Sequence, residues 1–357
     1  MDTHDELLAA RRQKLAALQA QGIQPYGGTF PKTESIAQTV ASYEEGRMVA
    51  SAGRLSSSRA HGAITFADLR DASGKIQLCF RQERLGPELY QRFDLLDLGD
   101  WIGVEGRLFR TKTGEITVEV ERFVLLAKTL RPLPEKWHGL RDVEIRYRRR
   151  YLDLAANEPV RRVFEQRARL INSLRSTLSG RGFLEVETPM MHLLPGGAAG
   201  EPFVTHHEAL DLNLYLRLAP ELHLKRLLVG GFERVFEINR SFRNEGLSTK
   251  HNPEFTMLEA YCAYEDDRFM MRLVKELICE ATTQTLGTLQ WDYQKLSIDL
   301  SKEWEVVSFT ELLKRGYGLA PQDGLEAMQQ KLRQPKSGFP AITMKTQSRS
   351  QLLRVVE

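Results

Sequence analysis

The sequence has few cysteines and no long apolar run, and both absences narrow the classes of protein that it can encode. Its three cysteines, Cys79, Cys262 and Cys279, lie far apart and form no CxxC or Cys/His pattern with the spacing of a zinc site. The first residues, MDTHDELLAA, lack the apolar region of a secretory signal. No apolar run approaches the roughly 18 residues that span a bilayer. We therefore expect a reduced, cytoplasmic protein with no structural metal and no membrane segment.

Net charge is also small, although charged residues are abundant. The 357 residues include 50 Lys and Arg against 47 Asp and Glu, for a net charge of +3. Charge at this density can be sorted into patches, which permits nucleic-acid binding without proving it. A chain of this length is long for one domain and comfortable for two, each with its own hydrophobic core.

The first 130 residues predict a helix followed by a small β-barrel. Apolar residues at helical spacing predict an amphipathic helix over residues 3–21, with Arg11, Arg12 and Lys14 on its polar face. Those basic side chains either contact RNA phosphates or face solvent. Five β runs follow between turn signals, at residues 48–55, 63–69, 75–80, 101–108 and 115–125. With a helix inserted at residues 83–96, this pattern suits an oligonucleotide-binding barrel, the OB-fold.

Residues 131–142, RPLPEKWHGLRD, are the best linker candidate because two prolines and a glycine separate periodic segments. The next segment, IRYRRRYLDL, concentrates arginines that either contact RNA or pack between domains: Arg146, Arg148, Arg149 and Arg150. Asn157 is then the expected cap of a helix that runs to Gly180. The strand GFLEVETP follows and ends at Pro189.

Residues 232–261, FERVFEINRSFRNEGLSTKHNPEFTMLEAY, predict a strand, a loop and a second strand. Arg243 lies at the end of the first strand, and Phe255 opens the second. A guanidinium at that position is always charged and can chelate two oxygens of an α-phosphate while negative charge grows there. The alternative is a surface arginine that pairs with Glu237 or Glu245.

This segment, with RNEG followed by HNPEFT, resembles motif 2 of class II aminoacyl-tRNA synthetases, and the lysyl-tRNA synthetase family in particular. The resemblance implies that Arg243 is the catalytic residue, and that it binds ATP together with Glu245, His251, Asn252 and Phe255. In that family the carboxylate of lysine attacks the α-phosphate, Mg²⁺ bridges the phosphates, and tRNA(Lys) then accepts the lysyl group. The order of helix, strand and proline up to Pro189 resembles motif 1, which implies a homodimer.

The residues for lysine itself follow from charge and from the same resemblance. Each ammonium group of a bound lysine must meet carboxylates or hydrogen-bond acceptors. By resemblance, Glu221 and the backbone near Gly197 hold the α-amino group, while Glu259 and Tyr261 hold the ε-amino group. Glu259 and Tyr261 are two residues apart, so in a strand both point to the same side. Glu221 alternatively begins a helix as a favourable acid near its positive end.

The barrel carries a second resemblance. In lysyl enzymes it binds a U-rich anticodon, and Phe66, Gln77 and Glu115 match the positions that face those bases. Phe66 alternatively belongs to the barrel core. We therefore expect an α+β fold with a helix and lead-in at 1–46, an OB-fold anticodon-binding domain at 47–130, a linker at 131–150, and an antiparallel-sheet catalytic domain at 151–357.

The chain contains no string of the form GxGxGxDR, which is motif 3 of class II enzymes, nor the preceding segment that supplies Mg²⁺-binding acids. We therefore expect an incomplete catalytic domain with almost no ATP–pyrophosphate exchange and no metal ligand of its own. It is either a fragment of a lysine–tRNA ligase or a truncated, non-catalytic tRNA-binding paralogue. Among enzymes, aspartyl- and asparaginyl-tRNA synthetases share this architecture. Their sites, however, should place cations opposite the acidic or amide side chain of the bound amino acid.

Overall fold

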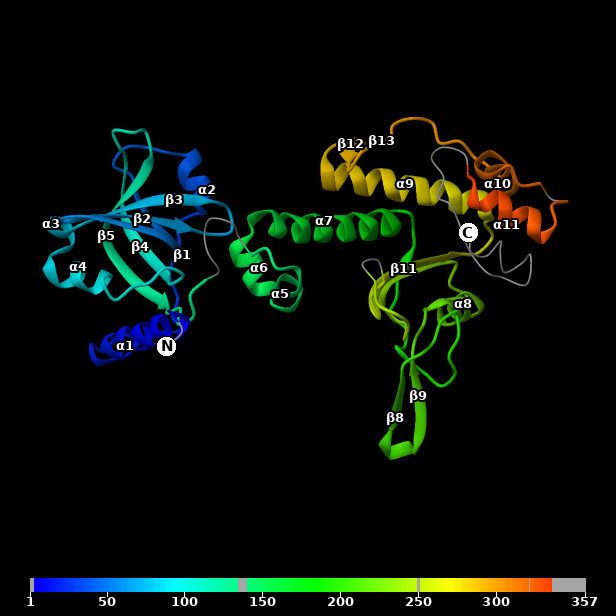
Figure 1. Ribbon diagram of the computed structural model, residues 1–357, viewed down its shortest axis with the longest axis horizontal. Helices are drawn as coiled ribbons and strands as arrows, with labels where there is room; N and C mark the ends of the chain where they lie inside the picture. Colours follow the sequence, from blue (N-terminus) through cyan, green and yellow to red (C-terminus); the bar gives the residue numbers. More distant parts are fainter. Residues whose placement is uncertain (1–2, 134–139, 249–250, 321, 336–357) are drawn as a thin grey trace. The chain divides into compact units, whose positions relative to one another are not determined.

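The computed structural model describes residues 3–133, 140–248, 251–320 and 322–335 (Figure 1). The chain divides into two compact units, Met1–Phe164 and Glu165–Glu357. Within the described ranges, no helix is both long enough and apolar enough to cross a membrane. Helices and a largely antiparallel set of sheets are both present, as the α+β prediction required.

The first unit contains the predicted five-stranded barrel. Its strands hydrogen-bond in the closed order β1-β2-β3-β5-β4, and only β3 and β5 run parallel. The barrel follows two helices, α1 (Thr3–Ala20) and α2 (Ile36–Ala41). Its strands are β1 (Met48–His61), β2 (Ile64–Arg70), β3 (Lys75–Arg81), β4 (Trp101–Arg110) and β5 (Ile116–Ala127).

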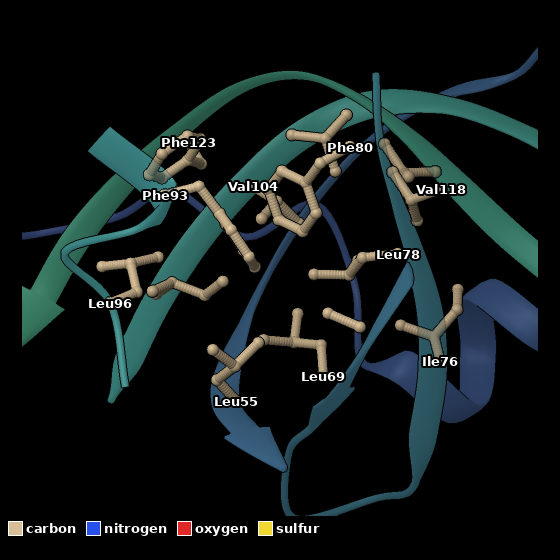
Figure 2. Close-up of a cluster of buried hydrophobic side chains, with 14 of the residues drawn as sticks. Leu55, Leu69, Ile76, Leu78, Phe80, Phe93, Leu96, Val104, Val118 and Phe123 are labelled. Carbon is tan, nitrogen blue, oxygen red and sulfur yellow. The ribbon is translucent and has the colours of Figure 1, made fainter. Parts of the chain in front are cut away.

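Alternation along each strand builds the barrel core. In β3, Ile76, Leu78 and Phe80 point inward and are at most 2% exposed. Figure 2 shows these side chains among the apolar residues of the neighbouring strands. Phe80 lies 4.3 Å from Phe93, measured between ring centroids. Burial of each large apolar side chain contributes about 1.5–3 kcal/mol, so the core supplies a large share of the favourable folding energy.

The helix predicted at residues 83–96 is wrong in its continuity. Two short helices occupy this stretch, α3 (Gln82–Leu85) and α4 (Pro87–Phe93). Gly86 separates them with a φ of 75°, a left-handed conformation that favours glycine. Pro87 has no backbone N–H and therefore begins a new helix instead of continuing the first.

Two of the three basic residues on the polar face of α1 form contacts within the first unit that the sequence did not predict. Arg11 is buried, and its guanidinium donates hydrogen bonds to the carbonyl oxygens of Thr129 at 2.9 Å and Leu98 at 3.1 Å. Lys14 donates to Asp97 at 3.0 Å. Only Arg12 is exposed. Two of the three basic residues therefore attach α1 to the barrel.

Two helices lie within or just after the predicted linker, α5 (Val143–Arg148) and α6 (Arg150–Ala156). Arg146 and Arg150 both bind the buried carboxylate of Asp153. Asn157 directly precedes the next helix, and its side-chain amide donates to Asp153 at 2.6 Å and to the carbonyl oxygen of Leu140 at 3.0 Å. Most charge in this arginine-rich stretch is thus used locally. The linker prediction at residues 134–139 lies outside the described residues.

The second unit is built around an antiparallel hairpin, β10 (Arg234–Phe242) with β11 (Glu254–Cys262), flanked on the β10 side by β6 (Leu184–Glu185). β6 is much shorter than the strand predicted at residues 182–189. The long helix α7 (Glu158–Gly180) precedes it. The other elements are β7 (Met191–His192), β8 (Val204–His207), β9 (Leu212–Leu216), α8 (Glu221–Val229), α9 (Asp267–Leu286), β12 (Gln290–Tyr293), β13 (Leu296–Asp299), α10 (Phe309–Tyr317) and α11 (Leu325–Arg333).

A compact apolar cluster supports this hairpin. Leu178 of α7, Phe236 of β10, and Leu273 and Leu277 of α9 pack together with Phe183. The β8–β9 hairpin extends away from this cluster (Figure 1). Residues of β10 and β11 that do not face the cluster are free to form a polar site.

Candidate functional site

The outer face of the barrel carries a groove of about 590 Å³. Phe66 and Gln77 line it together with a second aromatic residue, Phe109. Phe66 is half-buried and does not belong to the core cluster, so its alternative assignment to the barrel interior is wrong. Four basic residues also line the groove: Arg59, Arg81, Arg110 and Lys112. Aromatic faces beside cations are the combination that single-stranded nucleic acids require.

Strand alternation explains why these side chains meet. Phe66 and Gln77 occupy positions of β2 and β3 that alternate with the buried Ala67 and Leu78, so they point outward. Gln77 accepts a hydrogen bond from the Thr117 hydroxyl at 2.9 Å, which holds its side chain on this face.

Glu115 does not line the groove. It is exposed in the turn between β4 and β5, where its N–H donates to the hydroxyl of Thr111 at 3.0 Å, and Thr111 is a groove residue. Sequence reasoning missed Phe109 and the four basic residues. Their only signal is their place on outward-facing strand positions and in the β4–β5 turn.

In the second unit, the predicted strand, loop and strand are present as β10 and β11. Their register runs from Arg234 opposite Cys262 to Phe242 opposite Glu254. Arg243 follows directly, and its N–H donates to the carbonyl oxygen of Pro253 at 2.9 Å. This bond extends the ladder by one residue and fixes where the Arg243 side chain leaves the sheet.

The guanidinium of Arg243 lies over the ring of Phe255, with 5.2 Å between its Cζ atom and the ring centroid. Its Nε is buried and has no hydrogen-bond acceptor among the described residues. Neither Glu237 nor Glu245 forms an ion pair with it within those ranges. The alternative of a surface-paired arginine is therefore wrong, and the side chain retains donors for an anionic ligand.

The other residues expected at ATP surround the same turn. Glu245 is exposed, and its Oε1 atom lies 2.9 Å from where a Cβ atom at Gly200 would be, so the carboxylate lies against the Gly200 backbone. His251 is exposed, with 2.7 Å between its Nδ1 and the Ser248 hydroxyl. Asn252 is also exposed. Residues 249–250, in the predicted loop, lie outside the described residues.

A second polar group lies where β11 meets the start of α8. The Tyr261 hydroxyl donates to Glu259 at 3.0 Å, and both side chains are partly buried. Glu221 is the first residue of α8, as its alternative role required, and its carboxylate accepts from Lys225 at 2.5 Å. A Cβ atom at Gly197 would lie 3.4 Å from that of Glu221, so the glycine backbone lies against this acid.

These acids influence one another. Burial, and then the nearby carboxylates of Glu221 and Glu237, raise the pKa of Glu259 above its usual value. Burial and the hydrogen bond to Glu259 raise the pKa of Tyr261. Ionised Glu259 is therefore held close to other negative charges, an arrangement that favours binding of a cation.

A buried ion pair that sequence reasoning missed lies beside the acids. Arg217 donates to Glu237 at 2.7 Å, and the two side chains are 0% and 1% exposed. Glu237 faces Glu259 across the β10–β11 ladder. The Arg217 Nη2 is buried and has no acceptor among the described residues. Its only sequence signal is one arginine inside the apolar run LYLRLA.

The chain thus combines a closed five-stranded barrel with an antiparallel β10–β11 hairpin, and each carries a candidate site. Residues 49–126 match the OB-fold nucleic acid binding domain, and residues 142–347 match the tRNA synthetases class II (D, K and N). The second match spans more than half of the chain, which therefore belongs to the class II tRNA synthetases of this group and, within them, to the lysine–tRNA ligase family.

The similarity to individual lysine–tRNA ligases is high. The chain is 55% identical over 317 residues to that of Pelotomaculum thermopropionicum, a match that covers 88% of this chain and 63% of the relative. It is 53% identical over 321 residues to that of Moorella thermoacetica, covering 89% and 66%. The chain thus spans less than two thirds of the length of these relatives. The resemblance inferred from motif 2 is confirmed.

Among the described residues, no group of three or more His, Cys, Asp or Glu side chains is placed to hold a metal. We assign no step to Mg²⁺.

Proposed function

We propose that this chain carries the lysine site, the α-phosphate contact and the anticodon site of an enzyme that activates lysine with ATP and transfers it to tRNA(Lys). The observation that carries the proposal is the acidic group formed by Glu221, Glu259 and Tyr261. Carboxylates of this kind, partly buried and close together, select a ligand with ammonium groups at both ends.

Arg243 is proposed to act on the second substrate. The carboxylate of lysine attacks the α-phosphate of ATP, pyrophosphate leaves, and negative charge grows on the α-phosphate oxygens. A guanidinium with unused donors, fixed by its stack on Phe255, stabilises that charge. Glu245, His251 and Asn252 are proposed to surround the same nucleotide. No protein nucleophile is needed, because the residues act by positioning and by charge.

The groove on the barrel is proposed to hold the anticodon of tRNA(Lys). Phe66 and Phe109 offer faces on which unstacked bases can lie, and Gln77 offers polar atoms to base edges. The four basic residues of the groove suit the phosphates between those bases. Glu115, in the adjoining turn, is proposed to read a base from the rim.

A homodimer through the motif 1 region is also proposed. Several apolar side chains of α7 and the segment after it are strongly exposed: Val163, Leu170, Leu184, Met191 and Leu193. Exposed apolar groups in this number mark protein interfaces. Sedimentation of the wild-type chain and of Leu170→Glu tests this, and we expect a dimer that the charged substitution weakens.

Titration calorimetry with lysine, aspartate and asparagine tests the lysine site directly. Of the three amino acids, we expect only lysine to give heat of binding. Glu259→Gln removes the charge of that side chain and keeps its shape, and it should abolish the heat. Tight binding of aspartate would instead support an aspartyl enzyme. Binding of an anticodon stem-loop of tRNA(Lys) without any lysine binding would favour the non-catalytic tRNA-binding paralogue.

A further inference from the structure

We propose that Lys225 sets the affinity of the site for lysine by competing with the α-ammonium group of the substrate for Glu221. This inference rests on the proposed function, because it concerns the same acidic group. It identifies Lys225 as a specificity-determining residue, although sequence reasoning assigned it no role.

Lys225 lies against two of the four residues to which we assign lysine binding. Its ammonium nitrogen is 2.5 Å from the Glu221 carboxylate and 5.9 Å from the centroid of the Tyr261 ring. Glu221 and Lys225 are four residues apart on α8, so helical periodicity places them on one face. The helix thus carries its own alkylammonium group into contact with the residues proposed to bind one.

A count of charges shows why this matters. Of the three neighbouring acids, Glu237 is paired with Arg217 at 2.7 Å and Glu221 with Lys225. In the described part of the chain, no cation lies within ion-pairing distance of Glu259, which accepts from the neutral Tyr261 hydroxyl. One ammonium group of a lysine ligand therefore finds an uncompensated carboxylate, and the other must displace Lys225.

The competition is weak enough to be overcome by the substrate. The side chain of Lys225 is 54% exposed and that of Glu221 is 32% exposed. Ion pairs in such surroundings contribute little, because water screens them and both side chains lose freedom. Removing the competing charge is therefore expected to raise lysine affinity by about two- to fivefold.

The test compares two ligands on Lys225→Met, measured by titration calorimetry at fixed ionic strength. Lysine requires Glu221, whereas 6-aminohexanoate has no α-amino group and engages the Glu259 end alone. We expect tighter binding of lysine and unchanged binding of 6-aminohexanoate. Lys225→Arg keeps the cation and should bind lysine as the wild-type chain does.

Lys275→Met is the matched control. Lys275 lies on α9 with its ammonium 5.7 Å from the ring centroid of Trp304. Its substitution therefore removes a similar contact between an ammonium group and an aromatic ring at another place. Unchanged or weaker lysine binding by Lys225→Met, or equal gains for both ligands, would overturn the competition. Failure of the wild-type chain to bind lysine would overturn the proposed function as well, so the two failures are distinguishable.

Discussion

Among single residues, Arg217 and Glu237 form the buried ion pair of the second unit. Arg217 also donates to the Arg240 carbonyl oxygen at 2.8 Å, and the Thr188 hydroxyl donates to Glu237 at 2.6 Å. The pair therefore joins three segments that are distant in sequence. A buried ion pair adds little net stability, but breaking it leaves an uncompensated charge in the interior. The strand that carries Glu237 also leads to Arg243, the proposed α-phosphate contact.

We predict that Arg217→Met lowers the free energy of unfolding by about 3–5 kcal/mol, because Glu237 is left buried without its partner. Urea unfolding measures the loss. Arg240→Met is the control, since Arg240 and its partner Glu254 are 50% and 56% exposed and the loss there should stay below about 1 kcal/mol. Equal losses in the two variants would contradict the structural role of the buried pair.

Glu259 provides a prediction with a definite sign in pH. Its pKa is raised in the folded chain, so its ionised form destabilises the fold. Stability should therefore increase as pH falls through that raised pKa, while lysine affinity decreases, because binding requires the carboxylate. Thermal melting and calorimetry between pH 4 and 8, about the range that brackets a raised carboxyl pKa, measure both.

Glu259→Gln should separate the two effects. At neutral pH it should melt at a higher temperature than the wild-type chain and bind lysine about 30-fold more weakly or worse. Glu254→Gln, an exposed position on the same strand, should change neither property. A Glu259→Gln chain that is less stable than wild type at neutral pH would contradict the assignment.

Among elements, α1 shows that basic residues of a helix can form contacts that helical periodicity does not predict. Apolar spacing predicts the helix correctly, with Leu18 buried at 2% exposure. The basic face, however, meets carbonyl oxygens at the base of the barrel. A guanidinium carries several donors on a long stem, so it can reach backbone acceptors that the sequence pattern does not identify.

We predict that Arg11→Met loosens α1 while the barrel stays folded, because hydrogen bonds of a charged donor contribute about 1.5–3 kcal/mol. Hydrogen exchange measured by mass spectrometry should show faster exchange over Thr3–Ala20 only. The neighbouring Arg12→Met removes an exposed arginine from the same helix and should leave the exchange rates unchanged. If both variants behave alike, the contacts with Thr129 and Leu98 do not anchor the helix.

The hairpin of β10 and β11 was predictable, whereas the helix at 83–96 was not. Phe236 and Ile238 alternate with the polar Glu237 and Asn239 and identify a strand, since the pleat sends successive side chains to opposite faces. At Gly86 and Pro87 the apolar spacing continues, although the backbone cannot continue as one helix. Periodicity records which face is buried, and it does not record a change of backbone conformation.

At the scale of the whole molecule, the two proposed sites lie in different compact units, so each can be altered separately. We predict that Phe66→Ala weakens binding of an anticodon stem-loop of tRNA(Lys) by about 1–3 kcal/mol, which is roughly 5- to 150-fold, through loss of stacking. Lysine binding should not change, because its residues belong to the second unit.

Fluorescence anisotropy of a labelled stem-loop measures the RNA affinity. Tyr26→Ala removes a 43% exposed aromatic of the first unit that does not line the groove, and it should have no effect. Wild-type RNA affinity in Phe66→Ala would contradict the assignment of the groove as the anticodon site.

The sequence by itself determined the class of the protein, because motif 2 concentrates an arginine, acids and aromatics in one short, continuous hairpin. It also identified Glu259 and Tyr261 as neighbours, since their spacing in a strand requires it. Only the tertiary structure decided that Arg217 pairs with Glu237, that Arg11 anchors α1, and that Lys225 faces Tyr261. Those contacts join residues from separate elements, and a local pattern contains no information about which distant group each charge will meet.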